Sequence, residues 1–356
     1  MAIPNYSLYD TATLVQVIPS LFRPQNFLLD TFFPNIVTSD SEYIAIDVEI
    51  GDRRLAPFVS PYVEGHVMES LGYATKTYKP AYLKPKHAPD VRKPVKRMIG
   101  ERIGGEGDGP TRWAANIAAC MEEQINSIDR RMEWMAASAL SFGTVTVTGD
   151  GFPTEIVDFT RDASLTVTKT GGAKWTKANI AAGTAMPVSD VEVIQRNILK
   201  ISGARVDKLV FTTSSWNAFI QDPILKGVTF FPTLAPFGNQ INIGSEIAPG
   251  AIYKGRWGSF DLYLFNDWYL SPTTATLTPM LVDGTVLVGG PDLMGTRAFG
   301  MILDPHFNYS SMEYAPRSWM SDDPAQFFIM TQSAPLVIPS RVNATAAIVA
   351  CDPVYT

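Results

Sequence analysis

The sequence predicts an α+β protein organised around one unusually long helix. The strongest signal is a run of apolar residues that recurs every three or four positions from Trp113 to Ala139, which is the spacing of one helix face. A second signal is the alternation of apolar and polar residues over 43–50, which indicates a strand. After Gly143, short strand-like and helix-like runs alternate with glycine-containing turns, which indicates a smaller mixed unit.

The composition indicates a folded chain that uses part of its surface for contact with partners. Hydrophobic residues make up 46% of the 356 residues and charged residues only 18%, below the roughly 25% of typical soluble domains. A thinly charged surface suits a monomer poorly, so we expect some of it to be an interface. The net charge of −6 argues against a protein whose whole surface binds nucleic acid. No apolar run approaches the roughly 18 residues of a membrane-spanning helix, so no membrane partner is expected.

The first hundred residues predict an arm followed by a long loop. Residues 1–40 contain four prolines and a single basic residue, which suits an extended arm that lies on another surface. The strand over 43–50 leads into a turn at Gly51-Asp52. Six prolines between residues 55 and 94 exclude a helix or a central strand, so residues 41–100 are expected to form a protruding loop with edge-like strands.

Positive charge is concentrated in residues 76–97, called the basic segment below. With one acidic residue, Asp90, the segment has a charge of +7 within a chain of −6, which leaves −13 for the remaining residues. Its eight basic residues are Lys76, Lys79, Lys84, Lys86, Arg92, Lys93, Lys96 and Arg97.

The sequence leaves two interpretations of the basic segment open. Tyr73, Tyr78 and Tyr82 are interleaved with the lysines, and a basic strand with aromatic side chains can bind single-stranded nucleic acid. Alternatively, the proline-stiffened segment docks on an acidic neighbour, with the tyrosines providing contact area. Opposite charges segregated along one chain favour docking between copies, because each copy carries both halves of an attractive pair.

A glycine-rich stretch precedes the long helix and is expected to act as a hinge. Its five glycines between residues 100 and 110 resemble a phosphate-binding loop, but a Gly-Lys-Ser/Thr motif is missing and nearby acidic residues would repel a phosphate. The helix is expected over 111–140, about 45 Å long at about 1.5 Å per residue. Its buried face is expected to contain Trp113, Ile117, Met121, Ile125, Ile128 and Met132.

The remaining chain predicts short helices and strands. Ser189 and Glu192 have the spacing of a capping box, which predicts a helix that begins there and ends at Gly203. Asp283-Gly284 is typical of a two-residue hairpin turn, here between residues 281–282 and 285–288. The other expected elements are strands at 144–148, 165–168 and 208–212, a helix at 214–225 interrupted at Pro223, and a hairpin over 251–265.

The sequence lacks the motifs of common hydrolases. It contains three histidines, His66, His87 and His306, and neither Gly-x-Ser-x-Gly nor His-Glu-x-x-His occurs. A hydrolase would have to orient His306 against Asp304, but a turn histidine with a local hydrogen bond explains the same residues more simply. We therefore expect no catalytic residue, no metal site and no cofactor.

Three segments resemble the major head proteins of lambda-type tailed bacteriophages. Residues 51–61 read Gly-Asp-Arg-Arg-Leu-Ala-Pro-Phe-Val-Ser-Pro, which matches that family's glycine turn and Ala-Pro-Phe-Val core. Residues 78–86 read Tyr-Lys-Pro-Ala-Tyr-Leu-Lys-Pro-Lys, which matches its basic Pro-Ala-Tyr stretch. Residues 333–339, Ser-Ala-Pro-Leu-Val-Ile-Pro, are similar to its closing strand. The order of arm, loop, hinge, long helix and α+β unit also resembles the family's layout over nearly the whole chain.

The resemblance implies the Hong Kong 97-type capsid fold. Residues 1–40 would then be the N-terminal arm, 41–100 the extended loop, 101–180 the peripheral domain with its spine helix, 181–330 the axial domain, and 331–356 a C-terminal strand that returns to the body. The implied function is a major capsid protein, not an enzyme, that self-assembles into pentamers and hexamers and closes an icosahedral head shell around packaged double-stranded DNA. A single-stranded nucleic-acid-binding protein remains the alternative.

The resemblance also implies partners and a location. Arg53, Arg54 and the eight basic residues of the basic segment are expected at contacts between copies. Decoration, scaffolding and portal proteins are the other expected partners, while DNA would lie in the lumen without specific binding. The protein would be part of the virion capsid and would be assembled in the host cytoplasm.

Overall fold

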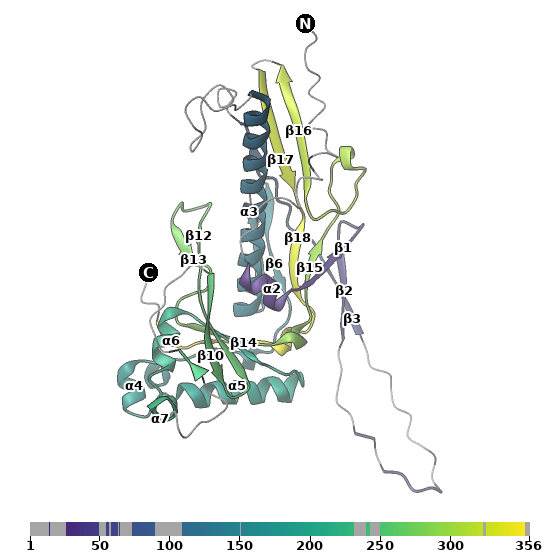
Figure 1. The fold of residues 1–356 in the computed structure, drawn as a ribbon. Coiled ribbons are helices and arrows are strands. Elements are labelled where there is room, and N and C mark those ends of the chain that lie inside the picture. Colours follow the sequence, from purple (N-terminus) through teal and green to yellow (C-terminus); the bar gives the residue numbers. More distant parts are fainter. Residues whose placement is uncertain are drawn as a thin grey trace.

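One upright helix, α3 (Gly109–Phe142), dominates the molecule, with strands along its length and a second unit of sheet and short helices at its foot (Figure 1). The computed structural model describes residues 26–49, 73–89, 109–149, 151–230, 250–322 and 325–352, and the short pieces 14, 55–56, 58–62, 64 and 240–242. Helices and strands are mixed along the chain, so the α+β prediction is confirmed. Among the described helices, none combines the length and apolar composition that a membrane-spanning segment needs.

Helix α3 spans 34 residues and exceeds the predicted range of 111–140 at both ends. It begins at Gly109, so Thr111 lies inside its first turn instead of preceding it. It stops at Gly143, where φ is +70° and the N–H donates to the carbonyl of Ala139 at 2.9 Å. A left-handed glycine directly after the last helical residue is the usual way to end a helix.

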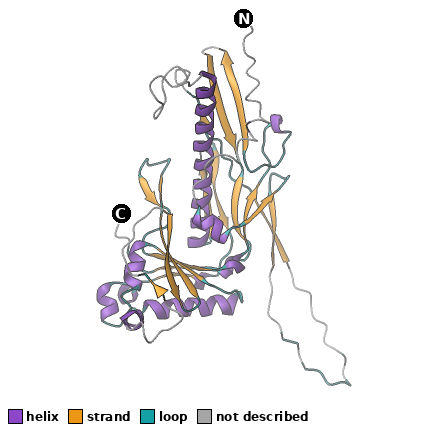
Figure 2. Ribbon diagram, in the orientation of Figure 1, coloured by secondary structure: helices purple, strands orange, loops and turns teal. Residues whose placement is uncertain are grey.

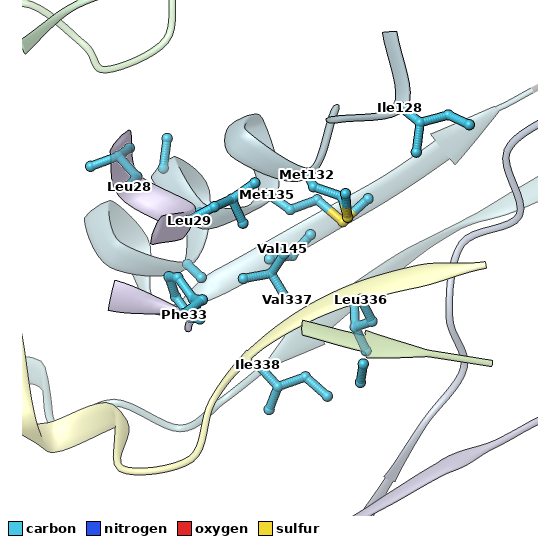
Figure 3. Packing of buried hydrophobic residues seen from close by; sticks show 14 of the residues in the cluster. Leu28, Leu29, Phe33, Ile128, Met132, Met135, Val145, Leu336, Val337 and Ile338 are labelled. Carbon is cyan, nitrogen blue, oxygen red and sulfur yellow. The ribbon is translucent and has the colours of Figure 1, made fainter. Parts of the chain in front are cut away.

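The main hydrophobic core packs around α3. Trp113 is partly exposed and lies edge-on against the ring of Phe327, with ring centroids 5.5 Å apart. Of the six residues predicted for this helix face, the five that are at most 3% exposed are Ile117, Met121, Ile125, Ile128 and Met132. Figure 3 shows the side chains that meet Met132 and Met135 in this core, which include Leu28, Leu29, Phe33, Val145 and Val337. Segments from both ends of the chain therefore converge on one helix.

Two hairpins accompany α3. The first consists of β16 (Ala315–Asp322) and β17 (Ala325–Gln332), which run beside the upper part of the helix in Figure 1. The short strand β4 (Lys86–His87) adds to β17 and ties the loop region to this hairpin. The second hairpin, β5 (Thr144–Gly149) and β6 (Phe152–Asp158), directly follows the helix.

The N-terminal part of the chain adds a short helix and further strands to the body. Helix α2 (Phe27–Phe32) contacts α3, and β1 (Asn35–Thr38) pairs in parallel with β15 (Gly295–Phe299). β15 pairs on its other side with β18 (Pro335–Pro339). Two further strands, β2 (Ile44–Glu49) and β3 (Tyr73–Tyr78), form an antiparallel hairpin that projects away from α3, at the place predicted for the protruding loop (Figure 1).

The second unit is built on a seven-stranded sheet with the order β7-β19-β14-β8-β11-β10-β9. Its strands are β7 (Thr166–Thr168), β8 (Lys208–Phe211), β9 (Gln240–Ile241), β10 (Gly250–Trp257), β11 (Phe260–Asn266), β14 (Thr285–Gly289) and β19 (Ala346–Val349). The helices gathered around it in Figure 2 are α4 (Lys177–Ala181), α5 (Pro187–Ile201), α6 (Thr213–Phe219) and α7 (Pro223–Phe230). A ribbon of β12 (Trp268–Leu270) and β13 (Leu277–Pro279) extends from this unit.

Short 3-10 turns connect several of these elements. They span Ala163–Leu165, Gly171–Ala173, Pro291–Leu293, Pro305–Phe307 and Val342–Ala344.

Two main hydrophobic cores divide the chain differently from the predicted ranges. The core around α3 includes Phe299 and Phe327, whereas the core of the seven-stranded sheet includes Trp175 and Leu262. Residues 181–330, expected to form the axial unit, therefore contribute to both cores. Strand β17 falls in this range and yet packs against α3, and β16 pairs with β17 in the same hairpin.

The predicted capping box at Ser189 and Glu192 is wrong. Helix α5 begins two residues earlier, at Pro187, with Met186 as the N-cap. Proline suits the first helical position because its missing N–H would have no partner inside the helix. The predicted end at Gly203 is correct, since this glycine has φ of +68° just after the helix.

The predicted hairpin at Asp283-Gly284 is also wrong. Strand β14 pairs with β8 and β19, and not with residues 281–282. The Asp283 carboxylate instead accepts the backbone N–H and the hydroxyl of Ser214, in the first turn of α6. Gly284 has φ of +87°, and a Cβ there would lie 2.2 Å from the carbonyl oxygen of Cys351. Asp283 and Gly284 thus contact segments that are distant in the sequence, which the local pattern did not indicate.

Candidate assembly interface

The base of the projecting loop is anchored in the core. In the hairpin of β2 and β3, Ile44 lies opposite Tyr78, and their side chains are 2% and 9% exposed. The ring of Tyr78 packs against that of Phe159, with centroids 5.6 Å apart. Burial, and secondarily the carboxylate of Asp158, raises the pKa of Tyr78 above its ordinary value. The loop therefore leaves the body from a fixed base.

The segment that returns from the loop is joined to the body by hydrogen bonds. Leu83 and Ser333 exchange backbone hydrogen bonds of 2.8 and 3.0 Å. The Tyr82 hydroxyl donates to Oε1 of Gln332 at 2.8 Å and accepts the backbone N–H of Leu303 at 3.1 Å. Burial raises the pKa of Tyr82 to about 12, so this hydroxyl stays protonated near neutral pH. These bonds give the loop a rigid attachment at its second end.

Four of the ten predicted interface residues lie in the described part of the chain, and three of them have described side chains. Lys79 forms a 2.9 Å ion pair with Glu42 of the same chain. The amine of Lys84 lies over the ring of Tyr82, 4.6 Å from its centroid. Lys76 is on β3 opposite Ile46. Arg53, Arg54, Arg92, Lys93, Lys96 and Arg97 lie outside the described residues.

Lys86 is held on an aromatic surface. Its amine lies 3.9 Å from the ring centroid of Phe328 and 4.9 Å from that of Trp319. These two rings stack across the β16–β17 hairpin, with centroids 5.5 Å apart. Arg317 approaches the Trp319 ring as well, so cations and aromatic rings share this face.

The tyrosines of the basic segment are poorly placed for stacking with nucleic-acid bases. Tyr78 is buried against Phe159, and the Tyr82 hydroxyl is bonded to the protein while Lys84 covers its ring. Base stacking on either ring would require these contacts to break, which weighs against a stacking platform.

Three large side chains among the described residues at the tip of the loop are almost fully exposed. Leu55, Phe58 and Tyr62 expose 94%, 107% and 98% of their surface. In the sequence this segment stands out as a family motif and not as a contact surface. The available signal was the presence of large apolar side chains in a proline-rich stretch without helix or strand periodicity. A projecting loop cannot bury them on its own body.

A pocket of about 170 Å³ lies where the β12–β13 ribbon meets α6 and β11. Its lining combines apolar, hydroxyl, amide and carboxylate groups from Thr212, Thr213, Phe265, Asn266, Asp267, Trp268, Pro279, Leu281 and Asp283. No sequence pattern indicates this pocket, because the lining residues come from separate segments that only the fold brings together.

Asp304, the carboxylate considered for orienting His306, bonds to the His306 backbone and to two other side chains. The Asp304 carboxylate accepts the backbone N–H of His306 at 3.0 Å, and it also binds Arg317 at 3.0 Å and Gln332 at 2.6 Å. Burial alone would raise the pKa of Asp304, but these hydrogen bonds outweigh it and lower the pKa. Asp304 is thus a structural carboxylate, and the described residues contain no group of three potential metal ligands.

The sequence matches a known protein family over almost its whole length. The model of the family described as phage major capsid protein E matches residues 10–350. Similar curated proteins include the major capsid proteins of Escherichia phage lambda, 27% identical over 337 residues, and of Enterobacteria phage P21, 27% identical over 341 residues. Each alignment covers 93% of this chain and 96% of the relative.

Solved structures share the fold. A prophage capsid protein from E. coli CFT073 superposes with a TM-score of 0.70 at 21% identity, covering 98% of this chain and 99% of the other. The capsid structure of cyanophage P-SCSP1u gives a TM-score of 0.50 at 9% identity, with 92% and 88% covered. At these identities the likeness establishes the fold.

Proposed function

Because the chain belongs to the phage major capsid protein E family, whose model spans residues 10–350, we propose that its copies form the pentamers and hexamers of an icosahedral phage head. The chain has the Hong Kong 97-type capsid fold and is a structural protein of the head shell, not an enzyme. The observation that carries the proposal is the match of one family over nearly the full length. The alternative of a single-stranded nucleic-acid-binding protein is not supported by the relatives, which are named as major capsid proteins.

The projecting loop supports the proposal on physical grounds. Its base and its return segment are fixed to the body, while its tip exposes Leu55, Phe58 and Tyr62. Exposed apolar surface of this kind marks an interaction site. We infer that the loop reaches a neighbouring copy, with Arg53, Arg54 and the basic segment contributing attraction to a chain that is otherwise acidic.

The remaining partners follow from family membership and stay proposals. Decoration, scaffolding and portal proteins would join the shell in the host cytoplasm, and double-stranded DNA would fill the lumen without specific binding. Removing the basic segment leaves a charge of −13, so a lumen wall free of that segment would be neutral to acidic. Such a wall would not bind the phosphates of the DNA tightly during packaging. A density map of the assembled shell with residues 76–97 lining the lumen would contradict this proposal.

Expression of the full chain by itself tests the assembly proposal directly. We expect negative-stain microscopy and sedimentation to show shells or rings with five-fold and six-fold symmetry. Co-expression with a scaffolding protein is the second arm, because a chain that needs a scaffold would form rings alone and closed shells only with it. Uniformly small particles in both arms would contradict the proposal.

A further inference from the structure

A histidine side chain joins the end of the short strand β4 to the spine helix. His87 is the last residue of β4, which pairs with β17. Its ring faces α3, where Nδ1 lies 3.4 Å from the side-chain amide nitrogen of Gln124. The other ring nitrogen, Nε2, lies 3.7 Å from the carboxylate of Glu123. One imidazole on β4 therefore contacts two successive residues of α3.

The buried amide of Gln124 determines which nitrogen of the imidazole carries the proton. The amide oxygen accepts the hydroxyl of Thr331 at 2.7 Å, and the amide nitrogen donates to the carbonyl of Ile329 at 2.9 Å. A carbonyl oxygen can only accept, so a reversed amide would place two acceptors against each other. Gln124 is 0% exposed, so water cannot replace either bond. The second hydrogen of the amide nitrogen is left for Nδ1 of His87, which is thereby assigned as an unprotonated acceptor.

Protonation of the imidazole opposes this arrangement. Both ring nitrogens of a charged histidine are donors, so a proton on Nδ1 would face the amide hydrogen of Gln124. Attraction between the charged ring and Glu123 acts in the opposite direction, but the Glu123 side chain is 74% exposed and its charge is screened by water. The buried amide has no such screening and cannot turn away. The contact with Gln124 therefore decides the response to acid.

The other described groups around the ring do not compensate for its charge. Strand β17 contains no charged residue. Lys86, the neighbour of His87 on β4, points to the opposite face of the sheet, where its amine lies over the ring of Phe328. On α3, Glu123 is the described residue whose charge comes within ion-pair distance of the imidazole.

We propose that His87 is an acid-sensitive latch that fastens the end of β4 to α3. The latch is closed while the imidazole is neutral, and it opens when the imidazole is protonated. Opening frees residues 86–88 first, because the backbone hydrogen bonds between Leu83 and Ser333 hold the other end of this segment. The latch acts within one chain, so it goes beyond the proposed shell function, which needs many copies.

Hydrogen exchange of the full chain at about pH 7.5 and about pH 5.5, corrected for the intrinsic effect of pH on exchange, tests the latch. We expect the protection of the backbone amides of residues 83–88 to fall about tenfold at the lower pH, the effect of one lost buried hydrogen bond. Strand β18 is the internal reference, whose protection should not change.

Two variants assign the response to the latch. His87→Asn keeps an acceptor near the position of Nδ1 but cannot be protonated, so its protection of residues 83–88 should be the same at both pH values. His306→Asn is the matched control, because this exposed histidine lies in a 3-10 turn outside the contact. It should respond to pH as the wild type does.

Three results would overturn the latch. The first is unchanged protection of residues 83–88 in the wild type at the lower pH. The second is a rise in protection that Glu123→Gln removes, because the ion pair would then dominate. The third is an equal fall in the wild type and in His87→Asn, which would assign the response to another group. The wild-type measurement decides if His87→Asn does not fold, and none of these results bears on shell formation.

Discussion

The carboxylate of Glu133 accepts the backbone N–H of Leu28 at 2.8 Å, which links the C-terminal third of the spine helix to a segment 105 residues earlier in the chain. Its second oxygen accepts the N–H of Leu29 at 3.0 Å. Glu133 is 2% exposed, so a single buried carboxylate satisfies two donors at the start of α2. The N-terminal segment is thereby fixed to α3 by a polar contact inside an apolar core.

This contact predicts a pH dependence of stability. Burial raises the pKa of Glu133 to about 7 in spite of the two backbone donors, and the carboxylates of Asp267 and Asp30 add to the rise. Between pH 4.5, the ordinary pKa of a glutamate, and about pH 7, Glu133 therefore keeps its proton in the folded state and has released it in the unfolded state. The contribution to stability is fully present below pH 4.5 and is lost as the pH rises toward 7, by about 1.4 kcal/mol per pH unit.

Glu133→Gln is expected to remove this dependence. The uncharged amide should cost about 1–3 kcal/mol near pH 5, because its NH₂ group meets a backbone N–H donor. Above pH 5 the difference between wild type and variant should shrink. Urea unfolding at several pH values checks this, and parallel pH profiles for the two chains would contradict the assignment.

We expect Arg161 to stabilise the fold by binding the C-terminal end of α3. Its guanidinium donates to the carbonyls of Leu140 and Ser141, both at 2.5 Å. Burial lowers the pKa of Arg161 to about 10, which leaves the group charged at neutral pH. Arg161→Met should cost about 2–4 kcal/mol, because it leaves helix-end carbonyls unsatisfied and removes a favourable charge from the negative end of the helix.

Arg161→Lys is the matched control for the cap. Lysine keeps the charge but lacks the planar guanidinium that reaches two carbonyls. The stability of Arg161→Lys should therefore lie between those of the wild type and Arg161→Met. Chemical denaturation of the three chains gives the order. Equal stability of Arg161→Met and wild type would show that the cap contributes nothing.

A charged side chain in the middle of the buried face of α3 should greatly reduce the stability of the fold. Ile125 is 1% exposed, so Ile125→Asp would bury a carboxylate in the core and should cost at least 4 kcal/mol, leaving the chain insoluble. Ala119→Asp is the control, since Ala119 is exposed on the same helix and should lose less than about 1 kcal/mol. Soluble yield and shell formation are the measurements. A soluble, assembly-competent Ile125→Asp chain would contradict the burial.

Local patterns succeeded where one segment determines its own structure. The helical spacing from Trp113 to Ala139 predicted α3 to within two residues at each end, and the alternation over 43–50 predicted β2. Helix α3 buries one face against a single core, so its period is visible in the sequence. In the proline-rich stretch that follows β2, the described residues 55–56 and 58–62 are exposed, whereas residues 78–89 are bonded to the body, which the prediction of a single protruding loop did not anticipate.

Other features depend on contacts between distant segments and left no local signal. Asp283-Gly284 has hairpin chemistry, yet its neighbours pair with β8 and β19, which lie tens of residues away in both directions. The clamp of Glu133 on Leu28 joins residues that share no motif. The same holds for the pocket beside Asp267, whose walls come from separate elements. Charge clustering did indicate an interface, but the exposed tip at Phe58 required the structure.

Reversal of charges in the basic segment is expected to impair assembly of the shell. Replacing Lys84, Lys86, Lys93 and Lys96 with Glu converts the segment from +7 to −1. If the segment contributes attraction to a neighbouring acidic copy, the variant should remain folded and fail to form shells, because attraction becomes repulsion. The loss of the Lys86 contacts with Phe328 and Trp319 should cost only about 1–2 kcal/mol, too little to unfold the chain.

A variant with the same change in net charge elsewhere separates this effect from general repulsion. Lys177, Arg196, Lys200 and Lys226 are exposed in the second unit, and their replacement with Glu also changes the charge by eight. Shell yield from microscopy, at low and high salt, is compared for both variants. A specific role for the basic segment requires that only its reversal abolishes shells and that high salt weakens assembly of the wild type. A reversed segment that still assembles and loses only salt-sensitive nucleic-acid binding would instead favour a nucleic-acid role for the loop.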